Sequence, residues 1–167
     1  VATTSSMWYA TAGDSWAQDT TNAEYLAFWD NRLWAIDNTG QLRYLPRGLG
    51  IGTAANWVVD AQLPLPDNYV NNLFVGPDAT GETILYAATR TGLYAHDAGT
   101  HRFVLTGLVY PYHNTVGRGA TAWRGDIYLA VGVGVYRYSP LQGTITVVGP
   151  DLDDGLETTY RGRIQTL

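Results

Sequence analysis

The 167-residue sequence predicts an all-β fold that is assembled from repeated four-stranded antiparallel units. Three observations lead to this prediction. Aromatic and β-branched residues gather in short apolar runs, and Gly, Asn, Asp and Pro end those runs. No window shows apolar residues at helical spacing with capping residues at its ends. Finally, the pattern of runs returns along the chain, which is typical of a repeat architecture.

The repeat is clearest between residues 27–44 and 121–138, which align at a constant offset of 94. The first segment reads AFWDNRLWAIDNTGQLRY and the second reads TAWRGDIYLAVGVGVYRY. Residues 73–97 form an intermediate copy with a longer first turn. Three matched pairs anchor the alignment of the outer copies: Trp29 with Trp123, Gly40 with Gly134, and Tyr44 with Tyr138.

Each copy continues into one further apolar run, so each unit is predicted to hold four short strands. The first unit places them near residues 25–29, 33–36, 42–45 and 57–61. The second places them near residues 73–75, 84–88, 93–96 and 103–106. The third places them near residues 120–123, 127–130, 135–138 and 145–148.

The two ends of the sequence read as incomplete units. Residues 7–28 align with residues 56–75, which puts Trp8 on Trp57, so the chain opens with the last strand of a unit. Residues 160–167 resemble the first strand of a unit. The predicted division is therefore a partial strand at 1–20, units at 23–66, 70–112 and 117–152, and a first strand at 160–167.

Units of four antiparallel strands that recur every 40 to 50 residues resemble the blades of β-propeller repeat proteins. The Kelch and WD signatures are absent, and the single Trp-Asp pair, Trp29-Asp30, lies in a first turn. The resemblance implies an arc of three complete blades with partial blades at both ends. Two such arcs would make a ring of about seven or eight blades. A two-sheet β-sandwich is the alternative use of a dozen strands.

Composition limits the classes of partner. Hydrophobic residues make up 46% of the chain and charged residues 15%, which is globular. The net charge is −5 and all ten basic residues are scattered arginines, which argues against a nucleic-acid partner. No apolar run reaches the roughly 20 residues of a membrane span, so membrane insertion is not expected. Cysteine is absent, which excludes disulfides and thiolate metal sites.

The sequence starts at Val1 without a charged or apolar leader, so we expect a processed product, a fragment or an internal segment. Abundant Tyr, Gly, Asp and Asn with no Lys or Cys resemble the composition of extracellular or virion-surface proteins of phage-tail or adhesion type. We therefore expect an extracellular or virion-surface location.

One acidic segment, GPDLDDGLE at residues 149–157, is a candidate calcium site through Asp151, Asp153 and Asp154. Alternating carboxylates suit a hard cation, as in the calcium loop of an EF-hand. The position at which that loop needs a bidentate Glu is occupied by Gly162. A solvated turn is the alternative. Two histidines beside Asp97, in AHDAGTH, suggest zinc only weakly, and exposed turn histidines are the alternative. No other cofactor is predicted.

Aromatic side chains supply the candidate ligand-binding residues. Trp16 stands in a polar segment, GDSWAQDTTN, and three more candidates lie together in VYPYHN: Tyr110, Tyr112 and His113. The VYPYHN segment could instead cover the apolar rim of the fold. The recurring Trp29 and Trp123 are expected to pack one unit against its neighbour. No nucleophile elbow occurs, and nothing selects a catalytic pair among the fifteen acids.

These features together favour a non-enzymatic binding or assembly module that contacts protein or glycan. The protein partner would be the remaining blades of a parent chain or other copies of the same chain. The alternative is a carbohydrate-active propeller, either a lectin or a glycoside hydrolase or lyase, since the fold itself hosts binders and enzymes alike.

Overall fold

A computed structural model of the chain describes residues 7–10, 16–19, 23–37, 41–60, 69–97, 99–100, 102–111, 114, 116–131 and 134–148. The described residues form β-strands and one 3-10 turn, η1 (Ala54–Asn56), which confirms the all-β prediction. The strands are β1 (Met7–Ala10), β2 (Trp16–Asp19), β3 (Tyr25–Trp29), β4 (Arg32–Ile36), β5 (Leu42–Leu45), β6 (Val58–Val59), β7 (Val70–Pro77), β8 (Thr83–Thr89), β9 (Gly92–Asp97), β10 (Arg102–Val109), β11 (Ala120–Trp123), β12 (Asp126–Val131), β13 (Gly134–Ser139) and β14 (Thr144–Val148).

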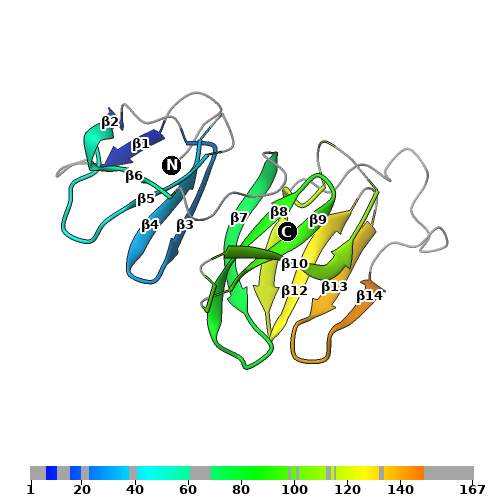
Figure 1. Cartoon of the computed structure of the whole chain (residues 1–167). Coiled ribbons are helices and arrows are strands. Elements are labelled where there is room, and N and C mark those ends of the chain that lie inside the picture. Colours follow the sequence, from blue (N-terminus) through cyan, green and yellow to red (C-terminus); the bar gives the residue numbers. More distant parts are fainter. Residues whose placement is uncertain are drawn as a thin grey trace.

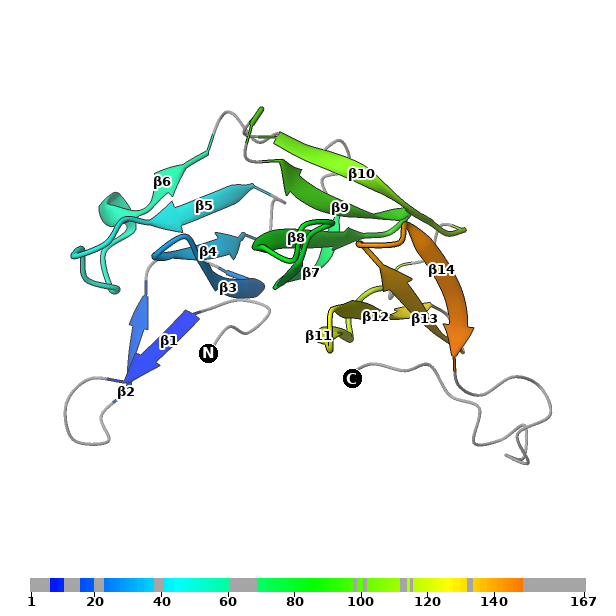
Figure 2. The same cartoon turned by 90° about the horizontal axis from the view of Figure 1, so that it is seen from below.

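The strands form four antiparallel sheets (Figure 1). Sheet A is the hairpin β1–β2, and sheets B, C and D are the four-stranded sets β3–β6, β7–β10 and β11–β14. Within each four-stranded sheet every strand pairs with its neighbour in the chain, so the repeated four-strand units of the sequence are confirmed. Figure 2 shows the sheets following one another around an arc, with β3, β7 and β11 along its inner side and β6, β10 and β14 outside.

Two matching turns show why the first two strands of sheets B and D align. β3 and β4 are joined by Asp30 and Asn31, which have φ values of 48° and 57°. β11 and β12 are joined by Arg124 and Gly125, with φ values of 51° and 87°. Positive φ at both central residues defines the type I′ turn, whose twist matches that of the flanking strands. The offset of 94 therefore holds structurally for these hairpins.

The third strand does not keep that offset. Trp34 on β4 pairs with Tyr44, while the equivalent Tyr128 on β12 pairs with Arg137. Tyr44 therefore corresponds to Arg137, and the predicted match with Tyr138 is wrong by one residue. The reason is that the connection between the second and third strands is one residue shorter in sheet D.

The start of the chain also differs from the prediction. Trp16, expected in a polar loop, is the first residue of β2, which pairs along its whole length with β1. Asp19 at the other end of β2 is buried, and its carboxylate accepts hydrogen bonds from the Gly52 N–H at 2.6 Å and the Trp57 indole at 3.3 Å. These bonds hold the hairpin against sheet B.

The core lies between the sheets. The buried residues shared by sheets B and C are Ala27, Trp34, Ile36, Leu42, Val70, Leu73, Leu85, Ala87, Tyr94 and Phe103. Those between sheets C and D are Tyr86, Ala88, Leu93, Leu108, Tyr110, Val116, Ile127 and Leu129. A third cluster, between sheets A and B, is Met7, Ala23, Ala35, Leu45 and Trp57. Sheet C is thus buried on both faces, because alternate side chains along a strand point to opposite sides.

Gly117, in the segment before β11, lies close to β8 of sheet C. Its φ is +81°, its N–H donates to the Ala130 carbonyl at 2.8 Å, and a Cβ added to it would lie 2.5 Å from the Cβ of Ala88 on β8. Gly81 in the β7–β8 turn has a similar φ of +90°, but a Cβ there would meet nothing within 4 Å. The two glycines therefore share the backbone requirement and differ in packing.

We expect Gly117→Ala to lower the free energy of unfolding by about 2–4 kcal/mol, because it adds overpacking between sheets C and D to the strain of a positive φ. Gly81→Ala should cost only about 1–2 kcal/mol, the backbone part alone. Urea unfolding followed by circular dichroism measures both. Equal losses for the two variants would contradict the close approach of Gly117 and Ala88.

Candidate interaction surfaces

Trp29 joins sheet B to sheet C. It is the last residue of β3, directly before the type I′ turn, and its indole Nε1 donates a hydrogen bond to the Thr83 carbonyl at the start of β8, at 2.8 Å. Its ring centroid lies 4.6 Å from that of His96 on β9, in an edge-on arrangement. The prediction that this recurring Trp packs one unit against the next is confirmed for Trp29.

Two further side chains continue the row from Trp29 across sheet B. The Trp34 ring lies 5.8 Å from Trp29 and 5.1 Å from Tyr44 on β5, and its indole donates to the Trp29 carbonyl at 3.0 Å. The Arg32 guanidinium lies 4.8 Å from the Tyr44 ring centroid. This aromatic row belongs to the core between sheets B and C.

The equivalent row on sheet D consists of Trp123, Tyr128 and Arg137. The rings of Trp123 and Tyr128 lie 6.0 Å apart, and the Arg124 guanidinium lies 4.5 Å from the Trp123 ring. Arg137 pairs with Asp126 across the strands at 3.6 Å. We call this side of sheet D, which points away from sheet C, the Trp123 face. Trp123 is 56% exposed, and no sheet in the described part of the chain packs on this face.

Sheet A carries a second aromatic surface. Its register places Trp8, Ala10, Trp16 and Gln18 on one side and the buried Met7 and Asp19 on the other. The first side is exposed, with Trp16 at 57%, and we call it the Trp16 face. The candidate ligand residue Trp16 therefore does lie at the surface, on a strand instead of a loop.

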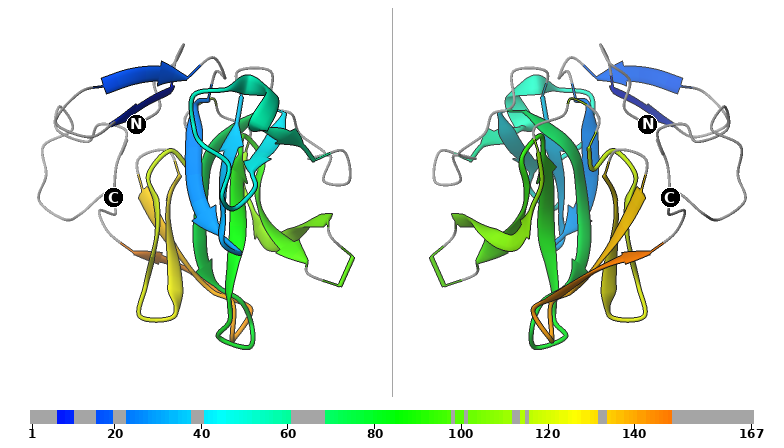
Figure 3. Two further views of the ribbon diagram at one scale, coloured as in Figure 1. Left: turned by 90° about the vertical axis from the view of Figure 1, so that its left-hand side faces the viewer. Right: turned by 90° about the vertical axis from the view of Figure 1, so that its right-hand side faces the viewer.

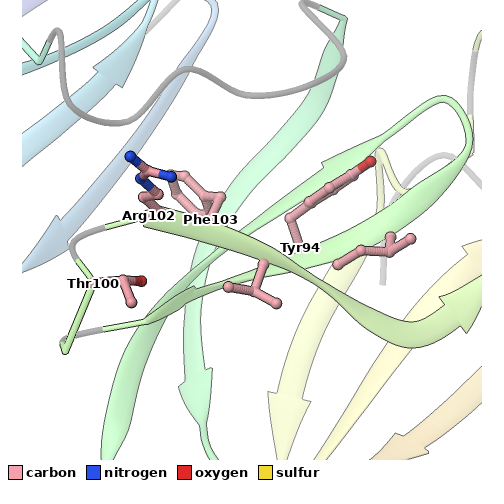
Figure 4. Close-up of a pocket in the computed structure, with 6 residues that line it drawn as sticks. Tyr94, Thr100, Arg102 and Phe103 are labelled. Carbon is pink, nitrogen blue, oxygen red and sulfur yellow. The ribbon is translucent and has the colours of Figure 1, made fainter.

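A shallow hollow of about 770 Å³ lies over β9 and β10 (Figure 4). Its floor is apolar and one end is polar; the lining residues are Tyr94, Thr100, Arg102, Phe103, Val104 and Leu105. Asp97 lies opposite Arg102 in the strand register, and the N–H of Thr100 donates to its carboxylate at 2.8 Å, which lowers the pKa of Asp97 below its ordinary value. The lining includes no carboxylate and no histidine, so the hollow suits binding of a small amphipathic group better than acid–base chemistry.

The other predicted ligand residues divide into two groups. Tyr110 is buried, its hydroxyl donates to the Thr89 carbonyl at 2.9 Å, and its N–H donates to the Thr91 carbonyl at 3.1 Å. The buried ring does not suit the predicted ligand-binding role of Tyr110 and fits the alternative that the segment covers the apolar rim of the fold. Tyr112 and His113 lie outside the described residues.

The candidate metal-binding residues lie in different parts of the chain. Asp151, Asp153 and Asp154 lie outside the described residues, so the calcium site stays a prediction. Among the residues that the structure describes, no three potential ligands of a metal ion gather together. His96 is buried between the rings of Trp29 and Phe103, whereas the sequence favours an exposed turn histidine.

No helix in the described ranges is long and apolar enough to cross a bilayer.

Comparison with known proteins supports the fold. No family model and no curated protein matches the sequence. PorZ, a bacterial surface component of the type-IX secretion system of Porphyromonas gingivalis, matches 79% of this chain with a TM-score of 0.54 and 17% identity. The extracellular domain of a putative hybrid two-component system of B. thetaiotaomicron matches 83% of it with a TM-score of 0.57 and 14% identity. The chain spans only 16% and 18% of these two structures.

We expect Trp29→Phe to lower the free energy of unfolding by about 1–2 kcal/mol, because the Thr83 carbonyl loses its donor and the contact between sheets B and C loses volume. Trp123→Phe, at the equivalent exposed position, should stay within about 0.5 kcal/mol in dilute solution. Urea unfolding of both variants at low protein concentration makes the comparison. A matching loss at Trp123 would show that its face is already covered.

Proposed function

We propose that the chain is a non-enzymatic binding and assembly module, an arc of propeller-like sheets that belongs to an extracellular or surface protein. The observation that carries this proposal is the contrast between Trp29 and Trp123. The two residues end the first strands of equivalent hairpins. The Trp29 indole donates a hydrogen bond to the next sheet, whereas the Trp123 side chain is 56% exposed.

The Trp123 face has the composition of a protein contact. It presents an indole and a phenol ring on a strand scaffold, beside one ion pair at 3.6 Å. Exposed aromatic surface of this kind marks interaction sites, and Trp, Tyr and Arg are the residues that anchor them. The equivalent face of sheet B is covered, because its row of Trp29, Trp34 and Tyr44 packs against sheet C.

The location outside the cell is supported by two kinds of observation. One similar structure is described as a bacterial surface component and the other as an extracellular domain. The sequence has no Cys and no Lys and is rich in Tyr and Gly, as expected for an exposed repeat protein. A virion protein of phage-tail or adhesion type is the more specific form of the proposal, and the protein partner would be further sheets of a parent chain or another copy.

Glycan binding is the second candidate function. Trp16 and Trp123 present exposed indoles, and Trp123 has polar neighbours in Asp126 and Arg137. An indole beside hydrogen-bonding groups can stack on a sugar ring and orient its hydroxyls. This observation favours a lectin over a hydrolase, because the described residues bring no pair of carboxylates together on the Trp123 face.

Two titrations of the same protein separate the candidates. If the Trp123 face contacts protein, we expect bis-ANS to bind it and Trp123→Glu to reduce the bound fluorescence, because a carboxylate replaces the apolar centre of the face. Leu141→Glu is the matched control, since Leu141 is 73% exposed in the β13–β14 turn. Neutral and acidic oligosaccharides should leave the tryptophan emission unchanged. A saturable sugar response that Trp123→Glu abolishes would overturn the assembly proposal and support the lectin.

A further inference from the structure

We propose that the partner of the Trp123 face is the Trp16 face of a second copy of this chain, so that two arcs associate head to tail into a closed two-fold ring. This inference rests on the proposed function, since it names the protein that covers the exposed face. The packing order of the sheets, the chemistry of the two faces and the shape of the arc all support this partner.

The packing order makes the two faces complementary. Sheet A packs on sheet B, sheet B on sheet C and sheet C on sheet D, and the inner strands β3, β7 and β11 are neighbours in that order. Each internal sheet uses one face for the sheet before it and the other for the sheet after it. Within the described residues, no sheet follows sheet D on the Trp123 face and no sheet precedes sheet A on the Trp16 face. One further step of the same packing places sheet A of a second copy on sheet D.

The side chains support this step. At the contact between sheets B and C, the Trp29 indole donates to a main-chain carbonyl of sheet C and packs against an aromatic ring of that sheet. Sheet A offers aromatic rings for such a contact, because the side chains of Trp8 and Trp16 are exposed on one face of the hairpin.

Charge disfavours the competing arrangement in which two Trp123 faces meet. That face carries two arginines, Arg124 and Arg137, and one carboxylate, Asp126, so a contact between two such faces would bring together surfaces of the same net positive charge. The Trp16 face is formed by Trp8, Ala10, Trp16 and Gln18 and has no charged group. A neutral aromatic face is the better cover for the Trp123 face.

The shape of the arc permits closure. In the end-on views of Figure 3, sheets A and D lie toward the same side of the molecule while β10 lies toward the other. Figure 2 shows the same two sheets as the ends of the arc. A two-fold axis between the ends brings sheet D of each copy to sheet A of the other. The same pair of faces then meets twice, related by the two-fold axis, which closes the assembly without an open polymer.

Sedimentation velocity over a range of protein concentrations tests the inference. The wild-type chain should pass from 18.3 kDa to twice that mass as its concentration rises. Trp123→Glu and Trp16→Glu should each weaken association by roughly 30-fold or more, the effect of losing an interface anchor. Leu141→Glu should dimerise like the wild type, because Leu141 lies on neither face.

A mixture of the two variants gives the decisive result. Trp123→Glu keeps an intact Trp16 face and Trp16→Glu keeps an intact Trp123 face, so the mixture can form one undamaged contact that neither variant forms alone. We expect dimer to reappear on mixing, and its return also shows that both variants are folded. Far-UV circular dichroism of each variant, alone, checks the fold independently.

Other outcomes overturn the inference. A chain that stays at 18.3 kDa at every concentration has no second-copy partner, and if bis-ANS binding persists, the proposed function itself survives. Dimerisation of Trp16→Glu alone would mean that the Trp123 faces meet each other. Species larger than the dimer would mean that the head-to-tail contact does not close. A sugar response at Trp123 would instead remove the proposed function.

Discussion

Face-to-face packing of aromatic side chains between neighbouring sheets is the constraint on which the rest of the structure depends. The contact of Trp29 with Thr83 and His96 shows it in one residue, since a hydrogen bond fixes the position and the ring fills the space. Each four-stranded sheet has apolar residues on both sides, so a single sheet cannot bury its own apolar surface and needs a neighbour to do so. The sheets stabilise one another in a row, and a row has two ends.

The N-terminal end shows how a partial unit can still be attached. The buried Asp19 carboxylate accepts from the Gly52 N–H and the Trp57 indole, both on the segment between β5 and β6. Burial of a carboxylate is unfavourable unless such donors satisfy it, so the hairpin and this segment depend on each other. The loop between β5 and β6 thus has a structural use, because it supplies the Gly52 N–H and the Trp57 indole that hold sheet A.

Local features were the most predictable from sequence. Short apolar runs bounded by turn residues marked most strands, and the offset of 94 marked the matching first hairpins of sheets B and D. The exceptions depend on tertiary contacts. Tyr110 sits in a polar, Pro-containing segment, yet its ring enters the core and its hydroxyl reaches Thr89. The strand from Trp16 to Asp19 has no apolar run that would mark it in the sequence. Its Asp19 carboxylate is buried because donors on a distant segment bind it.

The surfaces were harder to predict for a physical reason. Trp29 and Trp123 are the last residues of equivalent strands, directly before a type I′ turn, so the sequence pattern does not distinguish them. Their environments differ because sheet C follows sheet B, while no described sheet follows sheet D. Burial at this position is therefore a property of the next unit, not of the residue. In an arc of equivalent sheets, the residue that builds the core inside the row is exposed where no described sheet follows.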